Sequence, residues 1–241
     1  MKSFCRLTLL LIPVFFTSYP ALYAQGAANH SDSLLYWGKA LLKGTNQQNT
    51  TYQHKNNVVS WGENGVPVQC IADCSGFINA LIEKTDHWTD DNLKRNLGYK
   101  RLYAYHYVDA INSGRHFKKI VNIDDIRPGD LIAISYADRS EHEDNTGHIM
   151  LVVSLPQLHT PSKVLEPNTN QYGIDIIDCT KSPHGKLDTR YGTTYSGLGK
   201  GTFRLYTDLK GNITGYSWSI ENPKPGFDPY ANQVVVGRFI D

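Results

Sequence analysis

Three residues of types that could do chemistry together are Cys74, His148 and Asp178. Cys74 stands in the run Asp-Cys-Ser-Gly-Phe, between a polar stretch and the apolar helical pattern of residues 77–82. A cysteine in the first turn of a helix faces free amide protons and the positive end of the helix dipole. We therefore expect the pKa of this thiol to fall and its sulfur to be nucleophilic. On the local pattern alone, an inert buried cysteine fits equally well.

His148 and Asp178 could supply the acid–base partners of such a thiol. His148 follows Gly147 and opens the apolar run 149–153, where a sheet would fix its backbone and leave its ring at the strand end as a general base. Asp178 ends the strand pattern 174–178 and could accept the other imidazole N–H, which fixes the tautomer. Taken singly, the histidine is more simply a capping or core residue, and the aspartate the end of a strand at a solvated turn.

Hydrophobic periodicity predicts the helices that must position these residues. Apolar residues at helical spacing predict one helix from an N-cap at Asp32 to Gly44 and a second beginning near Cys74. Residues 46–57 are polar and predict a loop, whereas 85–117 predict a further helical region. Its candidate core residues are Leu93, Leu97, Leu102, Val108 and Ile111.

The second half of the chain has the pattern of strands. Short apolar runs bounded by turns predict strands at 131–135, 148–155, 174–179, 203–207, 216–220 and 234–240, with a hairpin turn at 210–212. Helices followed by strands predict an α+β domain with an antiparallel sheet.

Composition excludes several classes of partner. The 241 residues carry 24 basic and 23 acidic side chains, without a Lys or Arg run longer than a pair, so we expect no nucleic-acid partner. Neither Cys-x-x-Cys nor His-Glu-x-x-His occurs, so we expect no metal and no other cofactor. The acidic group 141–144 could hold a metal ion together with His148, but an acidic tip between two strands is expected to be a solvated loop instead.

The N-terminal residues have the layout of a secretory signal peptide. Lys2 and Arg6 precede the apolar run 7–16, and small residues follow up to Ala24. We expect residues 1–24 to be removed and the protein to be exported to a periplasm or the extracellular space. The apolar run is too short to span a bilayer, so no stable membrane insertion is expected after cleavage. An uncleaved membrane anchor is the alternative.

The mature chain would keep Cys70, Cys74 and Cys179 in a compartment where disulfides persist. An odd number leaves at least one thiol unpaired. A Cys70–Cys179 bond would leave Cys74 free and a Cys70–Cys74 bond would silence it, while no bond at all fits the sequence equally well.

Together these motifs resemble the NlpC-type (NlpC/P-sixty) cell-wall cysteine peptidases of the papain-like superfamily. The resemblance lies in the order of Asp-Cys-Ser-Gly-Phe at 73–77, Arg-Pro-Gly-Asp-Leu at 127–131, Gly-His-Ile at 147–149 and a strand ending at Asp178. It implies a papain-like fold, in which N-terminal helices, with the nucleophile helix among them, pack on an antiparallel sheet. Residues 25–241 would form a single catalytic domain with an insertion around 85–117.

The resemblance also implies roles for individual residues. Cys74 would be the nucleophile, His148 the base and Asp178 the third catalytic residue, with His184 as a competitor for that place. Asp73, Ser75 and Tyr52 would bind substrate, the first two along the peptide-binding groove. The aromatic stretch 103–107 of the insertion could form a wall of this groove or serve only for packing.

The implied activity is hydrolysis of an amide bond in the peptidoglycan stem peptide by an exported monomer, through an acyl-enzyme on Cys74. The expected bond joins D-glutamate to the following diamino acid. An amidase or acyltransferase on the same scaffold is the alternative enzyme. A catalytically inactive module that binds the cell wall is the alternative from another class.

Overall fold

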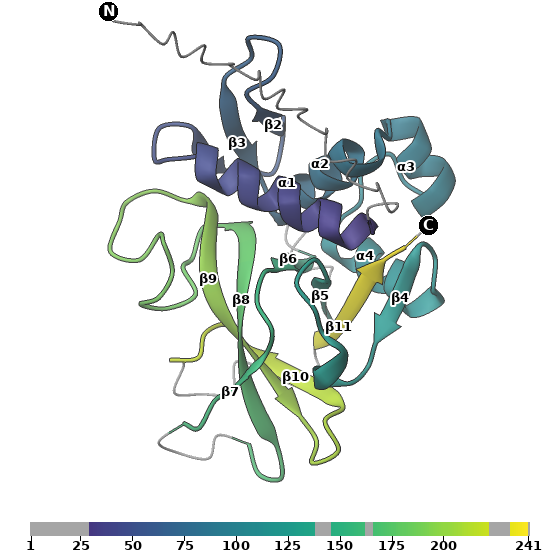
Figure 1. Ribbon diagram of the computed structural model, residues 1–241, viewed down its shortest axis with the longest axis vertical. Coiled ribbons are helices and arrows are strands. Elements are labelled where there is room, and N and C mark those ends of the chain that lie inside the picture. The colour runs from purple at the N-terminus through teal and green to yellow at the C-terminus, as the bar shows by residue number, and fades with distance from the viewer. Residues whose placement is uncertain (1–28, 138–145, 162–165, 222–231, 241) are drawn as a thin grey trace, which may run out of the picture.

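The computed structural model of the protein describes residues 29–137, 146–161, 166–221 and 232–240 (Figure 1). The signal peptide expected over 1–24 and the acidic group 141–144 lie outside these ranges. None of the helices described combines the length and the apolar composition needed to cross a membrane.

Helices occupy the first half of the described chain. They are α1 (His30–Gly44), α2 (Cys74–Asp86), α3 (Asp90–Leu97) and α4 (Ala104–Ser113), followed by the 3-10 turn η1 (Ile123–Asp125). The predicted end of α1 at Gly44 and start of α2 at Cys74 are confirmed. The predicted N-cap at Asp32 is wrong, because the side chain of Asn29 accepts from the Ser31 N–H and starts the helix earlier.

The helical region predicted over 85–117 contains two helices rather than one. The Thr89 and Asn92 side chains form a capping box that starts α3, and Gly98 ends it with a φ of 94°. The five core residues predicted in this region are all buried at 2% exposure or less.

A large antiparallel sheet carries the second half of the chain. Its strand order is β10-β9-β8-β6-β5-β11-β4, with β7 paired to β8. The strands are β4 (Phe117–Ile120), β5 (Leu131–Tyr136), β6 (Gly147–Val152), β7 (Gln157–Leu158), β8 (Asn170–Thr180), β9 (Gly197–Thr207), β10 (Ile213–Ser217) and β11 (Asn232–Phe239). An α+β fold with an antiparallel sheet is thus confirmed. Strand β10 begins before the predicted residue 216, since Asp208 accepts from the Lys210 and Asn212 N–H groups and closes the turn early.

A second, smaller sheet lies between α1 and α2 in the sequence. It consists of β1 (Thr50–Tyr52), β2 (Val58–Trp61) and β3 (Val68–Ala72), with β3 central, parallel to β1 and antiparallel to β2. The loop predicted over 46–57 is therefore wrong at β1. Three residues, two of them threonine, are too few to give a strand pattern, and their backbone pairing with β3 decides the structure.

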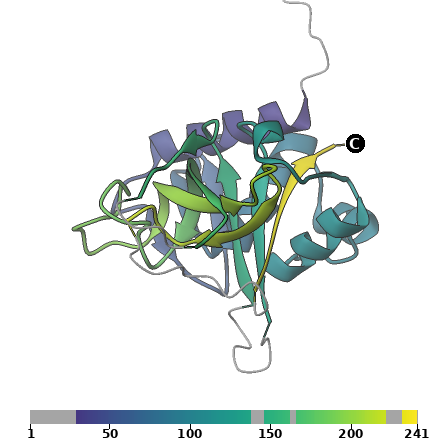
Figure 2. The same cartoon turned by 90° about the horizontal axis from the view of Figure 1, so that it is seen from below.

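The central strand β6 is buried along its whole length, with a hydrophobic core on each side. Ile149 and Leu151 pack with the helices, and Met150 and Val152 pack in the core on the opposite face. Figures 1 and 2 show the helices gathered along one side of the sheet, with α1 running across it. A Cβ on Gly38 of α1 would lie 2.4 Å from a Leu151 methyl carbon, so this glycine permits the close approach of helix and sheet.

Candidate active site

The nucleophile candidate Cys74 is the first residue of α2, directly after β3 and one capping residue. Asp73 provides this cap: its Oδ1 accepts from the Gly76 N–H at 2.6 Å and from the Ser75 hydroxyl at 3.1 Å. The chain passes from strand to helix with an extended residue between them, so the cysteine position is fixed by β3 on one side and the cap on the other.

The surroundings of Cys74 do not ionise its thiol, contrary to the expectation from the helix start. The backbone N–H groups of Ile149 and Ser75 lie near its sulfur and act to lower its pKa. Burial and the nearby Asp73 carboxylate act more strongly in the other direction and raise the pKa of Cys74 to about 12. The side chain is 6% exposed. The resting protein therefore holds a protonated thiol.

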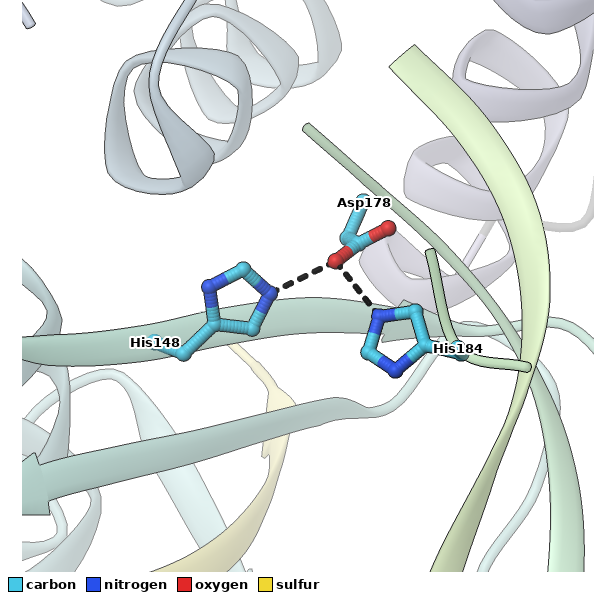
Figure 3. A group of neighbouring side chains, drawn as sticks. All are labelled: His148, Asp178 and His184. Atoms are coloured by element: carbon cyan, nitrogen blue, oxygen red, sulfur yellow. Dashed lines mark hydrogen bonds and ion pairs between the residues drawn. The ribbon is translucent and has the colours of Figure 1, made fainter. Parts of the chain in front are cut away.

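The base candidate His148 is the second residue of β6, adjacent in the chain to the Ile149 N–H that reaches the Cys74 sulfur. Its Nε2 lies 2.6 Å from Oδ2 of Asp178 (Figure 3). With Nε2 engaged, Nδ1 is the ring nitrogen that does not contact Asp178. Burial lowers the pKa of His148 from its usual value, so the imidazole is neutral at neutral pH.

Gly147 makes the position of His148 possible. It has a φ of +151°, and a Cβ there would lie 1.9 Å from the carbonyl oxygen of Ile134 on the paired strand β5. Only glycine can lie this close to Ile134 with this backbone conformation. Gly147 was part of the sequence motif, but this steric requirement was not predicted from it.

Asp178 lies on β8 with no exposed surface and orients the base. Its Oδ2 accepts from His148 and, at 2.9 Å, from Nε2 of His184, while its Oδ1 accepts from Arg190 at 2.7 Å. Burial alone would raise the pKa of this carboxyl, but the Arg190 and His184 charges and the two imidazole hydrogen bonds hold it well below its usual range. Of the two candidates for the third position, Asp178 contacts His148, and His184 contacts Asp178.

Both ring nitrogens of His184 have hydrogen-bond partners. Its Nδ1 lies 2.7 Å from the carbonyl oxygen of Trp218, and its Nε2 lies 2.9 Å from Oδ2 of Asp178. Its ring also stacks on Trp218 at a centroid distance of 4.1 Å.

Two residues of this hydrogen-bonded group were not predicted from the sequence, Asp188 and Arg190. The Arg190 guanidinium donates to both carboxylate oxygens of Asp188 and to the carbonyl oxygens of Asp178 and Gly197. Asp188 and Arg190 lie in an irregular segment between β8 and β9, where periodicity carries no signal. The Arg190 guanidinium is thus the counter-charge that the buried carboxylates of Asp178 and Asp188 share.

The side chains of His148, Asp178 and His184 are also the group that could hold a metal ion among the described residues, since one ligand atom from each lies within 4.8 Å of the others. A cation there would lie beside Arg190, which already bonds the same carboxylate. It would also displace the hydrogens that both Nε2 atoms donate to Asp178. The charges therefore favour a hydrogen-bonded relay over a metal centre.

A cleft of about 410 Å³ opens beside His148. Tyr52, Tyr136 and Trp218 give it aromatic walls. Its polar walls are His54, Thr180, Lys181 and Ser182. The structure thus brings Tyr52 to the site, and burial together with the adjacent Cys74 and Asp73 raises the pKa of this phenol.

Asp73 and Ser75, expected along the groove, do not reach the cleft surface. They are 3% and 2% exposed and their polar groups are used inside the protein. Besides capping α2, Asp73 forms an ion pair with Nη2 of Arg101 at 2.6 Å and lies 3.5 Å from Nδ1 of His54. Arg101 comes from the region 85–117, which the sequence did not connect with Cys74.

The aromatic stretch 103–107 of the insertion is not among the residues that line this cleft. Tyr107 is buried, and its hydroxyl donates to the side chain of Asn79 on α2 at 2.6 Å. Tyr103 lies under the Arg101 guanidinium. The stretch therefore supports α2 and Arg101, as in the packing alternative.

The cysteines Cys70, Cys74 and Cys179 are all free and buried. The Cys179 thiol donates to the carbonyl oxygen of Ala72 at 2.8 Å and is hydrogen-bonded to Cys70. Of the three disulfide states open from the sequence, the structure has the unbonded one.

Comparison with known proteins gives one relative to report. An "Uncharacterized protein R653" of Acanthamoeba polyphaga mimivirus is 35% identical in an alignment of 221 residues that covers 87% of this chain and 97% of the viral protein. No protein-family model matches the sequence, and no solved structure matches it.

Proposed function

We propose that this chain, which belongs to the same family as the mimivirus protein R653, is a cysteine hydrolase that cleaves an amide bond through an acyl-enzyme on Cys74. One observation carries the proposal. The backbone N–H of Ile149 lies close enough to the Cys74 sulfur to lower the pKa of the thiol, and the residue before Ile149 is a histidine whose Nε2 contacts a buried carboxylate. Nucleophile, base and orienting group are the three parts that such catalysis needs.

The first half-reaction starts from two neutral groups. His148 Nδ1 removes the thiol proton as the sulfur attacks the carbonyl carbon, forming a C–S bond and an oxyanion. The backbone N–H of Cys74, in the first turn of α2, supplies a donor to that oxygen. Collapse breaks the C–N bond, and His148 gives its proton to the leaving amine.

The second half-reaction regenerates the free enzyme. Water loses a proton to His148 and attacks the thioester, and the carboxylic acid leaves as the thiol is restored. Throughout, Asp178 stays ionised, because its pKa lies well below its usual range under the charges of Arg190 and His184. It stabilises the imidazolium that forms in each half-reaction.

A papain-like, NlpC-type domain is the fold that we propose for this site. Its support is the chain order: a helix that begins with the cysteine, then a sheet strand with the histidine and the next strand in the sheet with the aspartate. The proposed substrate is accordingly the peptidoglycan stem peptide, cut between D-glutamate and the diamino acid. This substrate requires an exported enzyme, which agrees with the signal-peptide layout of residues 1–24.

The test combines a probe and a digest. A thiol-reactive probe should label Cys74 at neutral pH, and His148→Ala should abolish the labelling, whereas an inactive wall-binding module would be indifferent to that change. Purified muropeptides are then incubated with wild type, Cys74→Ser and, as matched control, Cys70→Ser, and the products are weighed. The proposal is supported if wild type and Cys70→Ser yield muropeptide fragments of lower mass and Cys74→Ser does not. A new ester or amide product would indicate an acyltransferase, and unchanged masses would refute hydrolysis of this substrate.

A further inference from the structure

We propose that the cleft binds an anionic group of the substrate next to the scissile carbonyl, and that the ammonium group of Lys181 recognises it. The inference rests on the proposed function and specifies its substrate. It predicts a carboxylate, and not a free amino group, on the acyl side of the bond.

Lys181 has a fixed place in the cleft wall. It directly follows the last residue of β8, three positions after Asp178, and its Nζ lies 5.5 Å from the centre of the Tyr52 ring. Both residues line the cleft beside His148. The aromatic face holds the cation by its quadrupole and leaves the ammonium hydrogens free for a ligand.

The charge of Lys181 is uncompensated in the part of the chain that the structure describes. The cleft-lining residues include no carboxylate. The two carboxylates nearest the catalytic residues are already paired, Asp73 with Arg101 and Asp178 with Arg190 and His184. Among the residues that the structure describes, a ligand entering the cleft therefore meets one lysine without a counter-charge.

This arrangement disfavours a free amino group. Asp73 is 3% exposed and has both oxygens occupied, one by the α2 cap and one by Arg101. An ammonium group would find no available acceptor there and would be repelled by Lys181. By contrast, a glutamyl residue joined through one carboxyl keeps the other as a carboxylate, which Lys181 can bind by a charge-assisted hydrogen bond.

The experiment compares two alkylating reagents of similar size and different charge. Iodoacetate and iodoacetamide react with wild type, Lys181→Met and Lys39→Met at about pH 8.5, where lysines remain protonated. Both form a C–S bond with Cys74 and release iodide, and mass spectrometry follows the peptide that contains Cys74. Lys181→Met keeps the stem of the side chain without its charge, and Lys39, an exposed residue of α1, is the matched control.

The ratio of the iodoacetate rate to the iodoacetamide rate should fall by about threefold to tenfold in Lys181→Met, because the cation beside the Tyr52 ring is lost, and Tyr52 is itself close enough to Cys74 to interact with its thiol. It should not change in Lys39→Met. An unchanged ratio in Lys181→Met overturns the inference and leaves the nucleophile intact. Failure of both reagents to alkylate Cys74 in folded wild type overturns the proposed function, and this inference with it.

A second readout uses two substrates that differ in one group. Amides of D-glutamate linked through the side-chain carboxyl, with the α-carboxyl either free or converted to a carboxamide, are given to wild type and Lys181→Met. Wild type should have the lower KM for the free acid, and Lys181→Met should lose that preference. Equal KM values for the two substrates in wild type would overturn the inference.

Discussion

Arg190 holds Asp178 in place: its Nη2 donates to Oδ1 at 2.7 Å, and neither side chain has more than 2% of its surface exposed. A second hydrogen bond, from Nη1 to the Asp178 carbonyl oxygen, ties the guanidinium to the backbone of the same residue. The carboxylate cannot rotate without losing these contacts. Its other oxygen is thereby kept toward the imidazole of His148.

Replacement of Arg190 by Gln should destabilise the protein strongly. Two buried carboxylates, Asp178 and Asp188, would lose their counter-charge, which costs about 3–5 kcal/mol when one partner of a buried pair is removed. Denaturant unfolding followed by tryptophan fluorescence measures the change. Arg95→Gln on the exposed face of α3 should alter the unfolding free energy by less than about 0.5 kcal/mol. A similar small effect of Arg190→Gln would contradict the role given to the pair.

Asp178→Asn should leave the fold but remove most of the activity. The amide has nearly the same shape, but it cannot stabilise an imidazolium at His148 and it permits the wrong tautomer. Amide hydrolysis should fall by about 10³-fold or more, with little change in KM. Circular dichroism of the variant checks that the sheet is retained. Activity within tenfold of wild type would show that His148 does not depend on this carboxylate.

The value of kcat/KM should fall at acidic pH, and its pH profile should show no ionisation of a thiol near neutral pH. Because burial lowers the pKa of His148, the active neutral imidazole persists through neutral pH, and activity is lost only as pH falls below the usual histidine range. The thiol, with its pKa raised to about 12, stays protonated throughout. A rate profile over that range, repeated in heavy water, should show one acidic limb and a slower reaction in D2O. A preformed thiolate–imidazolium pair would instead react equally fast in both solvents.

Gly147→Ala should displace the base. The new Cβ would meet the carbonyl oxygen of Ile134 at 1.9 Å, so strands β5 and β6 must separate where His148 begins its pairing. We expect a loss of about 2–4 kcal/mol in unfolding free energy together with loss of activity. Gly65→Ala is the matched control, since Gly65 also has positive φ but open space around its Cβ. It should cost only about 1–2 kcal/mol, from the backbone alone.

The sequence was sufficient for the elements that bear the proposed nucleophile and base, because each begins at a clear change of pattern. The apolar helical face starts at Cys74, and the buried strand starts at Gly147. The strands of the small sheet were not predicted, since they are three to five residues long and partly polar. Short strands are decided by pairing with distant backbone, which periodicity does not contain.

The electrostatics of the site could not be predicted from local pattern. A helix terminus favours an anion by about 0.3–1 kcal/mol, less than one pKa unit, whereas full burial can shift a pKa by about 3–5 units in the opposite direction. At Cys74 burial therefore outweighs the helix. Similarly, no local sequence pattern predicts the ion pair between Asp73 and Arg101. None predicts the ion pair between Asp178 and Arg190 either.

Neighbouring residues of β8 connect to both halves of the site. Asp178 bonds His148, and the thiol of Cys179 donates to Ala72, two residues before Cys74. A single peptide unit thus sets the spacing between the base and the strand that leads into the nucleophile. A bulky adduct on Cys179 would shift both at once, so inactivation by a thiol reagent identifies the nucleophile only when the modified cysteine is mapped.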